Sequence, residues 1–374
     1  MQTSIVLANF LKNPYAWGFV LFWIGILIAC STLWVFEIRQ GKPNKSLESL
    51  LFWIFGLVML IFAVIRPIGI ARDDLVYLEY YETICPTLTC GQWLQGPRDV
   101  GWYSSLGFLK SFFPEPRIML WLGATGLLVK LAVIYSLVSR PMFALLPYAG
   151  IYYQVQDLTA WRVSLALTFL MVGIWFIVRT SKYWNAWILL LCGLFHKQAS
   201  VAPLIIMGAY LRRNRYLFII LSVTPVALLI TELYPPLHLI VSQIGGAFKE
   251  IAVSQGLNPY IQWKILGVYS GSRLAPVVVY PQILLTLWLL VKAKIDDDKL
   301  DALLCGCLFT ACLFLWVFAS LPNVQVRFFE FFMVPTVLLA GIRRLNGWEF
   351  LGVVFVSGIV VAKYNVVHQL IVQP

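Results

Sequence analysis

The sequence predicts an all-α protein, a polytopic bundle of transmembrane helices, and three observations support this prediction. The 374-residue chain is 60% hydrophobic and only 12% charged, whereas a soluble domain has about 25% charged residues. Apolar runs of about 20 residues, the length that crosses a bilayer as a helix, recur along the whole chain. Its 15 Trp, 17 Tyr and 25 Phe suit aromatic belts at the membrane interfaces. These features exclude an ordinary soluble globular protein.

The apolar runs predict about 12 spans, including short or broken helices. The clear spans are residues 16–36, 49–66, 118–138, 159–178, 216–234, 274–292, 300–320 and 347–366, and the shorter ones are 142–156, 183–195, 198–211 and 328–342. The pair 183–211 is either two short spans or a re-entrant hairpin, and both return the chain to the same side. Without a repeat or a soluble domain boundary, residues 1–374 are expected to form a single integral membrane domain.

The orientation follows from the Lys and Arg residues of the short loops. Half of the chain's 28 Lys and Arg residues lie in loops that would share one side: Arg39, Lys42, Lys45, Arg140, Arg179, Lys182, Arg212, Arg213, Arg215, Lys292, Lys294, Lys299, Arg343 and Arg344. Such loops are cytoplasmic by the positive-inside rule. The two longer loops, 67–117 and 235–273, are then expected on the outer, periplasmic side.

Composition and motifs also limit the function. The net charge of +11 comes from residues scattered between apolar runs, so topology and an anionic substrate explain it better than nucleic acid does. The sequence has no phosphate-binding glycine loop, HExxH or CxxC pattern, so we expect no metal and no cofactor. Five cysteines lie in apolar runs and should be core residues. Whether Cys85 and Cys90, in the first long loop, form a disulfide stays open.

The densest group of ionisable residues follows the second span, in IRPIGIARDDLVYLEYYE. It contains Arg66, Arg72, Asp73, Asp74 and Tyr77. In a helix, Asp73 and Tyr77 would share a face, and the arginines suit a diphosphate because guanidinium binds oxyanions bidentately. The alternative is an interfacial loop with local salt bridges.

Three further places put charge at the end of an apolar segment. Arg162 follows Asp157 at a turn between spans, where a boundary charge indicates function or else a pair that caps a helix. His196 and Lys197 separate two short apolar segments, and the histidine is suited to accept a proton, although a hairpin tip would look the same. Arg327 opens a later span among aromatic residues.

Five blocks follow one another along the chain: GIARDDLVY, DVGWYSSLGFLKSF, QDLTAWRVSLALTF, FHKQASVAPLI and VRFFEFFMVP. Their succession resembles the EpsG-type family of Wzy-like polysaccharide polymerases over roughly residues 50–345. The family pattern of arginine, glycine, aspartate and tyrosine after the second span matches Arg66, Gly69, Asp73 and Tyr77. It leaves open whether Asp73 or Asp74 is the equivalent aspartate. The later family positions fall on Arg162, His196 and Arg327, and an acidic position on Asp99.

The resemblance implies a glycosyltransferase of the bacterial inner membrane. Such enzymes transfer a growing glycan from undecaprenyl diphosphate to the sugar end of another lipid-linked repeat unit at the periplasmic face. The product would be O-antigen, as in lipopolysaccharide, or a capsule. The expected partners are these lipid-linked donor and acceptor oligosaccharides and the membrane lipids; a chain-length regulator is left open.

That reaction assigns roles to the residues above. The diphosphate leaving group needs cationic or hydrogen-bonding partners, for which we expect Arg66, Arg72, Tyr77, Arg162, Lys197 and Arg327. The acceptor hydroxyl needs a base, and His196, Asp73 and Asp74 are the candidates. Another lipid-carrier glycosyltransferase and an O-antigen ligase are alternatives. A flippase for the same lipid-linked sugars is less favoured because the chain lacks two comparable halves.

Overall fold

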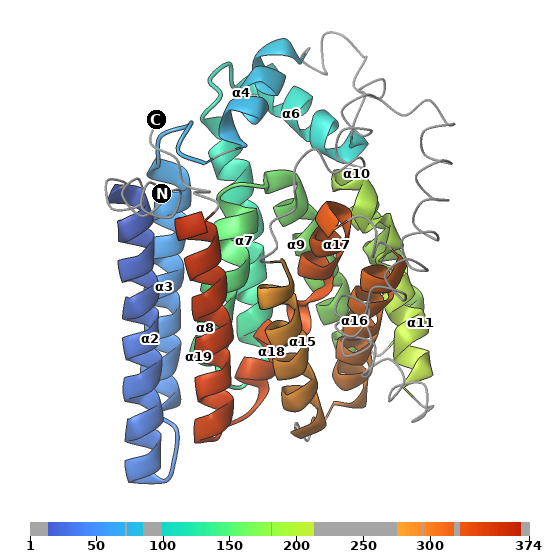
Figure 1. Ribbon diagram of the computed structural model, residues 1–374. Coiled ribbons are helices and arrows are strands. Elements are labelled where there is room, and N and C mark those ends of the chain that lie inside the picture. The colour runs from blue at the N-terminus through green and yellow to red at the C-terminus, as the bar shows by residue number, and fades with distance from the viewer. Residues whose placement is uncertain are drawn as a thin grey trace, which may run out of the picture. The chain divides into compact units, whose positions relative to one another are not determined.

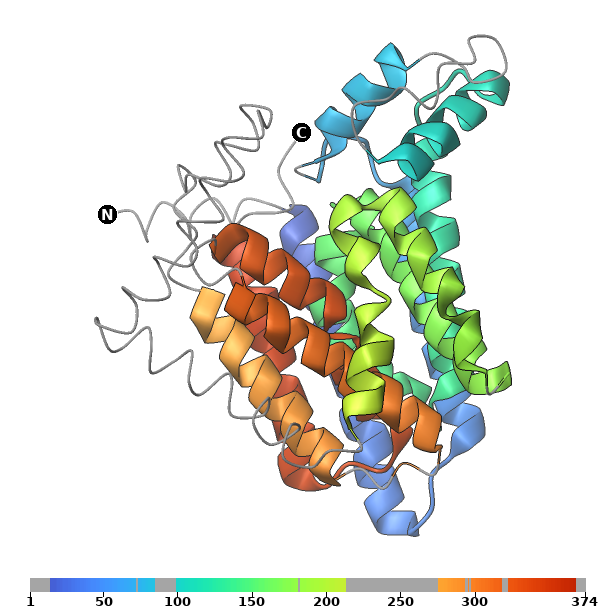
Figure 2. The same cartoon turned by 90° about the vertical axis from the view of Figure 1, so that its right-hand side faces the viewer.

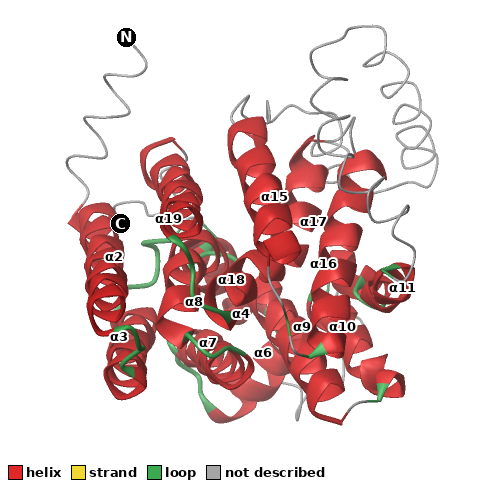
Figure 3. Cartoon of the chain, turned by 90° about the horizontal axis from the view of Figure 1, so that it is seen from below, coloured by secondary structure: helices red, strands yellow, loops and turns green. Residues whose placement is uncertain are grey.

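The computed structural model describes residues 14–71, 73–84, 99–180, 182–212, 275–292, 295, 297–317 and 322–367. In this part of the chain the regular secondary structure is helical (Figure 3), which confirms the all-α prediction. Five of the described helices are long and apolar enough to cross a membrane: α2 (Pro14–Gln40), α3 (Lys45–Ile65), α7 (Ile118–Leu137), α9 (Trp161–Thr180) and α19 (Gly347–Ala362) with its π-helical end η5 (Lys363–Val367).

Shorter elements replace several of the predicted spans. The segment 142–156 is α8 (Pro141–Pro147) followed directly by a π-helix, η2 (Tyr148–Asp157). The segment 183–211 consists of η3 (Tyr183–Leu190), α10 (Leu191–Phe195), η4 (Lys197–Val201) and α11 (Leu204–Leu211). The predicted span 216–234, the loop 235–273 and both Cys85 and Cys90 lie outside the described residues. The total of 12 spans therefore stays a prediction.

The chain divides into two compact units, which we describe separately. The first contains the described residues up to Ala202 and from Val337 onward, and the second runs from Pro203 to Thr336. Helix α18 (Val334–Ile342) carries the chain from the second unit back into the first.

In the first unit, α2 and α3 form a hairpin (Figure 1). Gly41 turns the chain with a φ of +71°, and the Asn44 side chain caps α3 by accepting from the Leu47 amide at 3.1 Å. Arg140, at the start of α8, donates to both Glu37 of α2 and Glu48 of α3, at 2.6 Å each. These bonds fix one end of the bundle.

A second buried ion pair lies in the middle of the unit. Lys130 of α7 is fully buried and pairs with Asp157 at the end of η2, while Ser164 and Tyr148 also donate to Asp157. A lone charge in an apolar bundle is costly, so each ion needs its partner. The sequence-based alternative in which Asp157 pairs with Arg162 is wrong.

At the other end, the described residues of the segment 67–117 include two helices, α4 (Asp74–Thr83) and α6 (Val100–Phe112), which lie beyond the end of α7 (Figure 1). A core of buried aromatic residues, which includes Tyr77, Tyr81, Trp102 and Trp161, packs these helices onto the start of α9. The segment η3–α10 runs alongside α9 (Figure 2), with Phe195 stacked on Phe169 at 5.0 Å.

In the second unit, α11 packs closely on α16 (Asp298–Val317) because two glycines face each other. A Cβ on Gly306 would lie 2.1 Å from the Ile205 carbonyl oxygen, and one on Gly208 would lie 2.8 Å from the Gly306 Cα. Small residues at such crossings are common in membrane bundles. The unit also contains α15 (Ala275–Lys292) and α17 (Pro322–Phe332). Among the core residues are Cys305, Cys307 and Cys312, and with Cys30 and Cys192 of the first unit they are buried as predicted.

Candidate active site

Arg66 and Asp74 form a closed ion pair where α3 ends. Two guanidinium nitrogens of Arg66 bind the two carboxylate oxygens of Asp74, one of them at 2.9 Å, and Nη2 also donates to the Leu158 carbonyl at 2.9 Å. The side chains are 1% and 0% exposed. We call this pair the Arg66–Asp74 clamp; it ties the end of α3 to the turn that precedes α9.

The local sequence explains why the clamp forms. Gly69 has a φ of +104°, a conformation that favours glycine. The resulting turn directs the amides of Gly69 and Ala71 at Asp74 Oδ2, at 3.0 and 3.1 Å. With these bonds and Arg66, the oxygens of Asp74 are occupied. Asp73, the preceding residue, is half-buried at the start of α4, and Arg72 lies outside the described residues.

Tyr77 links the clamp to the neighbouring aromatic residues. Its ring stacks on Trp161 at 4.9 Å and contacts Trp102 at 5.2 Å, while the Arg66 guanidinium lies 5.4 Å from the centre of the Trp161 ring. Burial raises the pKa of Tyr77 to about 12, against the opposing effect of Arg162. Tyr77 is therefore a neutral hydrogen-bonding group at physiological pH.

Asp99 is the centre of a second group of charges. Arg162 Nη1 donates to its Oδ2 at 2.7 Å, and the Lys197 amide donates to its Oδ1 at 2.8 Å. The His196 Nδ1 atom lies 4.0 Å from Oδ2, too far for a hydrogen bond but close enough for charge stabilisation. We call Asp99, Arg162, His196 and the Lys197 amide the Asp99 cluster.

Two local features bring the members of this cluster together. Asp99 occupies the N-cap position of α6 but makes no side-chain cap; its carboxylate is used by the cluster instead. Gly101 allows α6 to approach α10, because a Cβ there would lie 3.0 Å from the Leu194 carbonyl oxygen. His196 has an extended backbone between α10 and η4, which separates its side chain from both helices.

The cluster is partly open, unlike the clamp. The Arg162 side chain is 22% exposed and that of His196 is 13% exposed. His196 Nε2 contacts the Gln198 side chain at 3.1 Å, whereas His196 Nδ1 and Arg162 Nε are buried without a hydrogen-bond partner among the described residues. Buried polar atoms are normally paired. Here the unpaired atoms belong to two side chains that are partly exposed, so the cluster is a candidate place for a ligand.

The electrostatics keep Asp99 ionised. Burial alone would raise the pKa of its carboxyl group, but His196, Arg162 and the Lys197 amide together hold this pKa below its ordinary value of 3.8. The ionised carboxylate lies 4.0 Å from His196 Nδ1. The pair can therefore take up a proton from a bound hydroxyl group.

The structure joins most of the predicted site residues in one region of the first unit. The clamp contributes Arg66 and Asp74, and the Asp99 cluster contributes Arg162 and His196, with Tyr77 between them. Lys197 takes part through its amide, and its side chain is exposed. Arg327 lies on α17 of the second unit with an exposed side chain. No group of three or more potential metal ligands occurs in the described part of the chain.

Asp99 is the residue that sequence reasoning undervalued. It stands far from the other charged blocks, after a segment rich in glycine and polar residues, and only the resemblance indicated an acidic position there. The available signal was the DVG triplet, an acidic residue at the start of an apolar helix followed by a glycine. Its partners, Arg162 and His196, are 63 and 97 residues away, and no local pattern predicts such contacts.

The comparison with protein families identifies the chain's relatives. The model of the EpsG family matches residues 49–362, most of the chain and all of the site residues described above. The chain belongs to the EpsG family. No curated protein and no solved structure matches it.

Membership of the EpsG family agrees with the resemblance noted in the sequence and indicates a membrane polysaccharide polymerase. The apolar helices of the structure support the membrane location independently. The matched region begins in α3 and ends in α19, so it contains the clamp, the Asp99 cluster and the bundle that holds them.

Proposed function

We propose that this EpsG-family protein polymerises a surface polysaccharide from lipid-linked repeat units. The donor is a glycan on undecaprenyl diphosphate, and the acceptor is the sugar end of a second lipid-linked unit. The observation that carries the proposal is the Asp99 cluster, where a partly exposed guanidinium and a partly exposed imidazole both lie against Oδ2 of one ionised carboxylate.

In the proposed reaction His196 is the general base. The acceptor hydroxyl gives its proton to the imidazole while its oxygen attacks the anomeric carbon of the donor sugar. The new C–O bond forms as the bond between that carbon and the diphosphate oxygen breaks, and the diphosphate leaves with the electron pair. Asp99 stabilises the imidazolium that forms, as a carboxylate does in hydrolase triads.

Arg162 is the proposed partner of the diphosphate. One of its nitrogens is held by Asp99, which fixes the plane of the guanidinium, and the part of the side chain that is exposed, 22%, is open to a phosphate oxygen. Fixed donors directed at a developing charge lower the barrier because they need no reorganisation during the reaction. Lys197, Arg72 and Arg327 remain proposed contributors of positive charge, and Asp73 remains the alternative base.

Arg66, Asp74 and Tyr77 have a positioning role in this proposal. The clamp is too buried to touch a substrate directly, but it holds the Leu158 carbonyl, three residues before Trp161. Tyr77 packs against the Trp161 ring, next to Arg162 in the chain. Together these contacts set the start of α9, from which Arg162 extends.

We further propose that the site faces the periplasm of a bacterial inner membrane. Helix α3 is 21 residues long, about 30 Å at 1.5 Å per residue. Its first end lies among basic residues, with Lys45 in its first turn and Arg140 bound to Glu48, and its other end holds the clamp. By the positive-inside rule the basic end is cytoplasmic, which supports an outward-facing site.

The test is polymerisation in cells that lack the chromosomal gene. Plasmid-borne wild-type protein should restore a ladder of glycan lengths on a gel, whereas His196→Ala and Arg162→Ala, expressed to the same level, should leave single-repeat products. A full ladder from either variant contradicts the proposed site. Almost no surface glycan in the deletion strain would indicate a flippase, and polymer that is not transferred to lipid A would indicate a ligase.

A further inference from the structure

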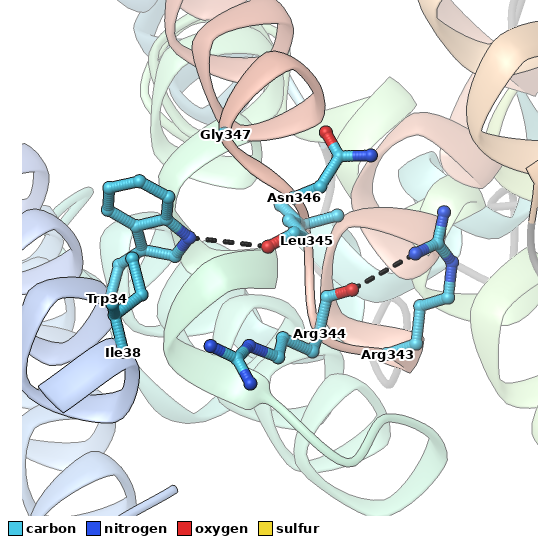
Figure 4. Close-up of a pocket in the computed structure, with 7 residues that line it drawn as sticks. All are labelled: Trp34, Ile38, Arg343, Arg344, Leu345, Asn346 and Gly347. Atoms are coloured by element: carbon cyan, nitrogen blue, oxygen red, sulfur yellow. Dashed lines mark hydrogen bonds between the residues drawn. The ribbon is translucent and has the colours of Figure 1, made fainter. Parts of the chain in front are cut away.

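A second binding feature lies at the basic end of the first unit, opposite the Asp99 cluster. It is an open cavity of about 320 Å³, within the range of roughly 300–1,000 Å³ that holds small ligands. Its walls are Trp34, Ile38, Arg343, Arg344, Leu345, Asn346 and Gly347 (Figure 4). The proposed polymerase reaction uses none of these residues.

The cavity has a rigid frame. The Trp34 indole donates to the Leu345 carbonyl at 3.2 Å and its ring stacks on Phe350 at 5.6 Å, which joins α2 to the start of α19. Asn346 and Glu349 complete a capping box, so two of the amides at the N-terminus of α19, their own, are already satisfied. A ligand would therefore be held by side chains rather than by this helix end.

The charges of the cavity are unequally exposed. Arg343 binds Glu349 at 2.5 Å, and Arg344 contacts Glu37 through Nε at 3.4 Å. The carboxylates are 1% and 4% exposed, whereas the Arg343 and Arg344 side chains are 27% and 49% exposed. The acidic groups face inward and the guanidinium groups face outward, so the open face of the cavity presents positive charge.

Apolar side chains continue from the cavity along both helices that form it. On α19, Trp348, Leu351 and Phe355 are 76%, 57% and 62% exposed and share one helical face. On α2, Ile38 and Val35 are 50% and 42% exposed. A cationic cavity above an exposed apolar surface is complementary to a molecule with an anionic head and a hydrocarbon tail.

We propose that this cavity binds an anionic phospholipid of the membrane leaflet at the basic end. The phosphate contacts the terminal nitrogens of Arg344 and Arg343, Trp34 lies beside the glycerol region, and an acyl chain follows the exposed faces of α2 and α19. Basic pockets between transmembrane helices bind anionic headgroups in this way. The bound lipid bridges α2 and α19 at the end of the bundle remote from the proposed active site.

Native mass spectrometry of the full-length protein in neutral detergent tests this proposal. The probes are phosphatidylglycerol and phosphatidylcholine with identical acyl chains, and the variants are Arg344→Gln and Arg39→Gln. Arg39 is a matched control because it is an exposed arginine in the last turn of α2 that does not line the cavity. Thermal melting checks that both variants stay folded.

We expect the wild type to retain phosphatidylglycerol in preference to phosphatidylcholine. Arg344→Gln should weaken phosphatidylglycerol binding about fivefold, the effect of one cation near an anionic headgroup, and Arg39→Gln should leave it unchanged. Equal retention of the two lipids, or equal loss in both variants, overturns the proposal. Displacement of the lipid by inorganic phosphate alone also overturns it, since the site would then bind a free anion.

Discussion

The Arg66–Asp74 clamp and the Asp99 cluster both pair an arginine with an aspartate, yet they differ in what surrounds the pair. In the clamp both side chains are almost fully buried, and the oxygens of Asp74 are occupied by Arg66 and two amides. In the cluster the Arg162 and His196 side chains are partly exposed, 22% and 13%. Arg66 Nε and Arg162 Nε are both buried without a hydrogen-bond partner among the described residues, so exposure is what separates the two pairs. The comparison teaches that an arginine–aspartate pair stabilises structure where it is fully buried and can serve chemistry where part of it is open.

The largest expected effect is a loss of stability when the ion pair of the Arg66–Asp74 clamp is broken. Asp74→Ala leaves a buried guanidinium without its counter-ion, and breaking such a pair costs about 3–5 kcal/mol. We expect the free energy of unfolding to fall by that amount and the protein to accumulate poorly in the membrane. Quantitative immunoblots and thermal melting in detergent measure this.

Asp73→Asn is the matched control for that prediction, because Asp73 is the adjacent aspartate but lies half-buried at the start of α4. It should change the melting temperature by much less than Asp74→Ala. If the two variants melt alike, the clamp does not have the structural role described.

The next effect is catalytic. His196→Ala should lower polymerisation by about 100-fold or more, the usual contribution of a general base, while the melting temperature changes little because the side chain has few partners. The readout is polymer formed per amount of membrane protein. His196→Gln, which keeps the bulk but cannot act as a base, should be as inactive; full activity of His196→Gln would remove His196 from the mechanism.

Asp99→Asn should have a smaller effect, about tenfold, because the amide oxygen can keep one of the two hydrogen bonds that Asp99 accepts but the side chain no longer carries a negative charge beside His196. The pH dependence of stability, compared between Asp99→Asn and the wild type, provides a sharper test. The folded-state pKa of Asp99 is lowered, so its stabilising charge is fully present above pH 3.8 and is lost as the pH falls through the lower folded value.

Stability of the wild type should therefore not vary with Asp99 between pH 5 and 8, and the acid-induced loss below about pH 4 should be smaller in Asp99→Asn. Acid titration of both proteins in detergent, followed by tryptophan fluorescence, compares them. An Asp99-dependent transition near neutral pH would show that the cluster has a different charge state from the one described.

The smallest effect is expected at Gly101. A Cβ at this position meets the Leu194 backbone at 3.0 Å, so Gly101→Ala should push α6 a few tenths of an ångström from α10 and weaken the Asp99–Lys197 contact. We expect activity to fall several-fold with a stability loss of about 1 kcal/mol, the low end of the cost of overpacking. Gly18→Ala, where a Cβ meets nothing within 4 Å, is the control and should leave activity unchanged.

The sequence predicts most of what depends on local periodicity and little of what depends on distant contacts. The long apolar runs gave α2, α3, α7, α9 and α19 with boundaries close to those observed, because burial in a bilayer leaves a continuous signal. Spacing could not predict which of Asp73 and Asp74 pairs with Arg66. That depends on the turn at Gly69, which directs two amides at Asp74.

The polar residues inside the bundle were harder still to interpret. Lys130 lies inside an apolar run, where no local pattern marks it as one half of an ion pair. For Asp157 the sequence offers Arg162 as the nearest cation along the chain. The structure instead pairs Lys130 with Asp157, and Arg162 with Asp99. Partner choice between several buried ions is decided by the crossing of α7, η2 and α9, and a linear sequence does not contain that geometry.

The π-helix η2 gives the chain an unusual sensitivity to length. Its residues advance by fewer degrees each than those of an α-helix, and the Leu158 amide closes it by donating to Tyr153, five residues earlier. If the π-helical bonding is kept, deleting one residue from η2 rotates everything after it by one residue step, which is less than the 100° step of an α-helix. Asp157 would then turn from Lys130, and Trp161 from Tyr77, although every side chain of the site was still present. The position of Arg162 is thus fixed by a count of residues as much as by any contact it makes.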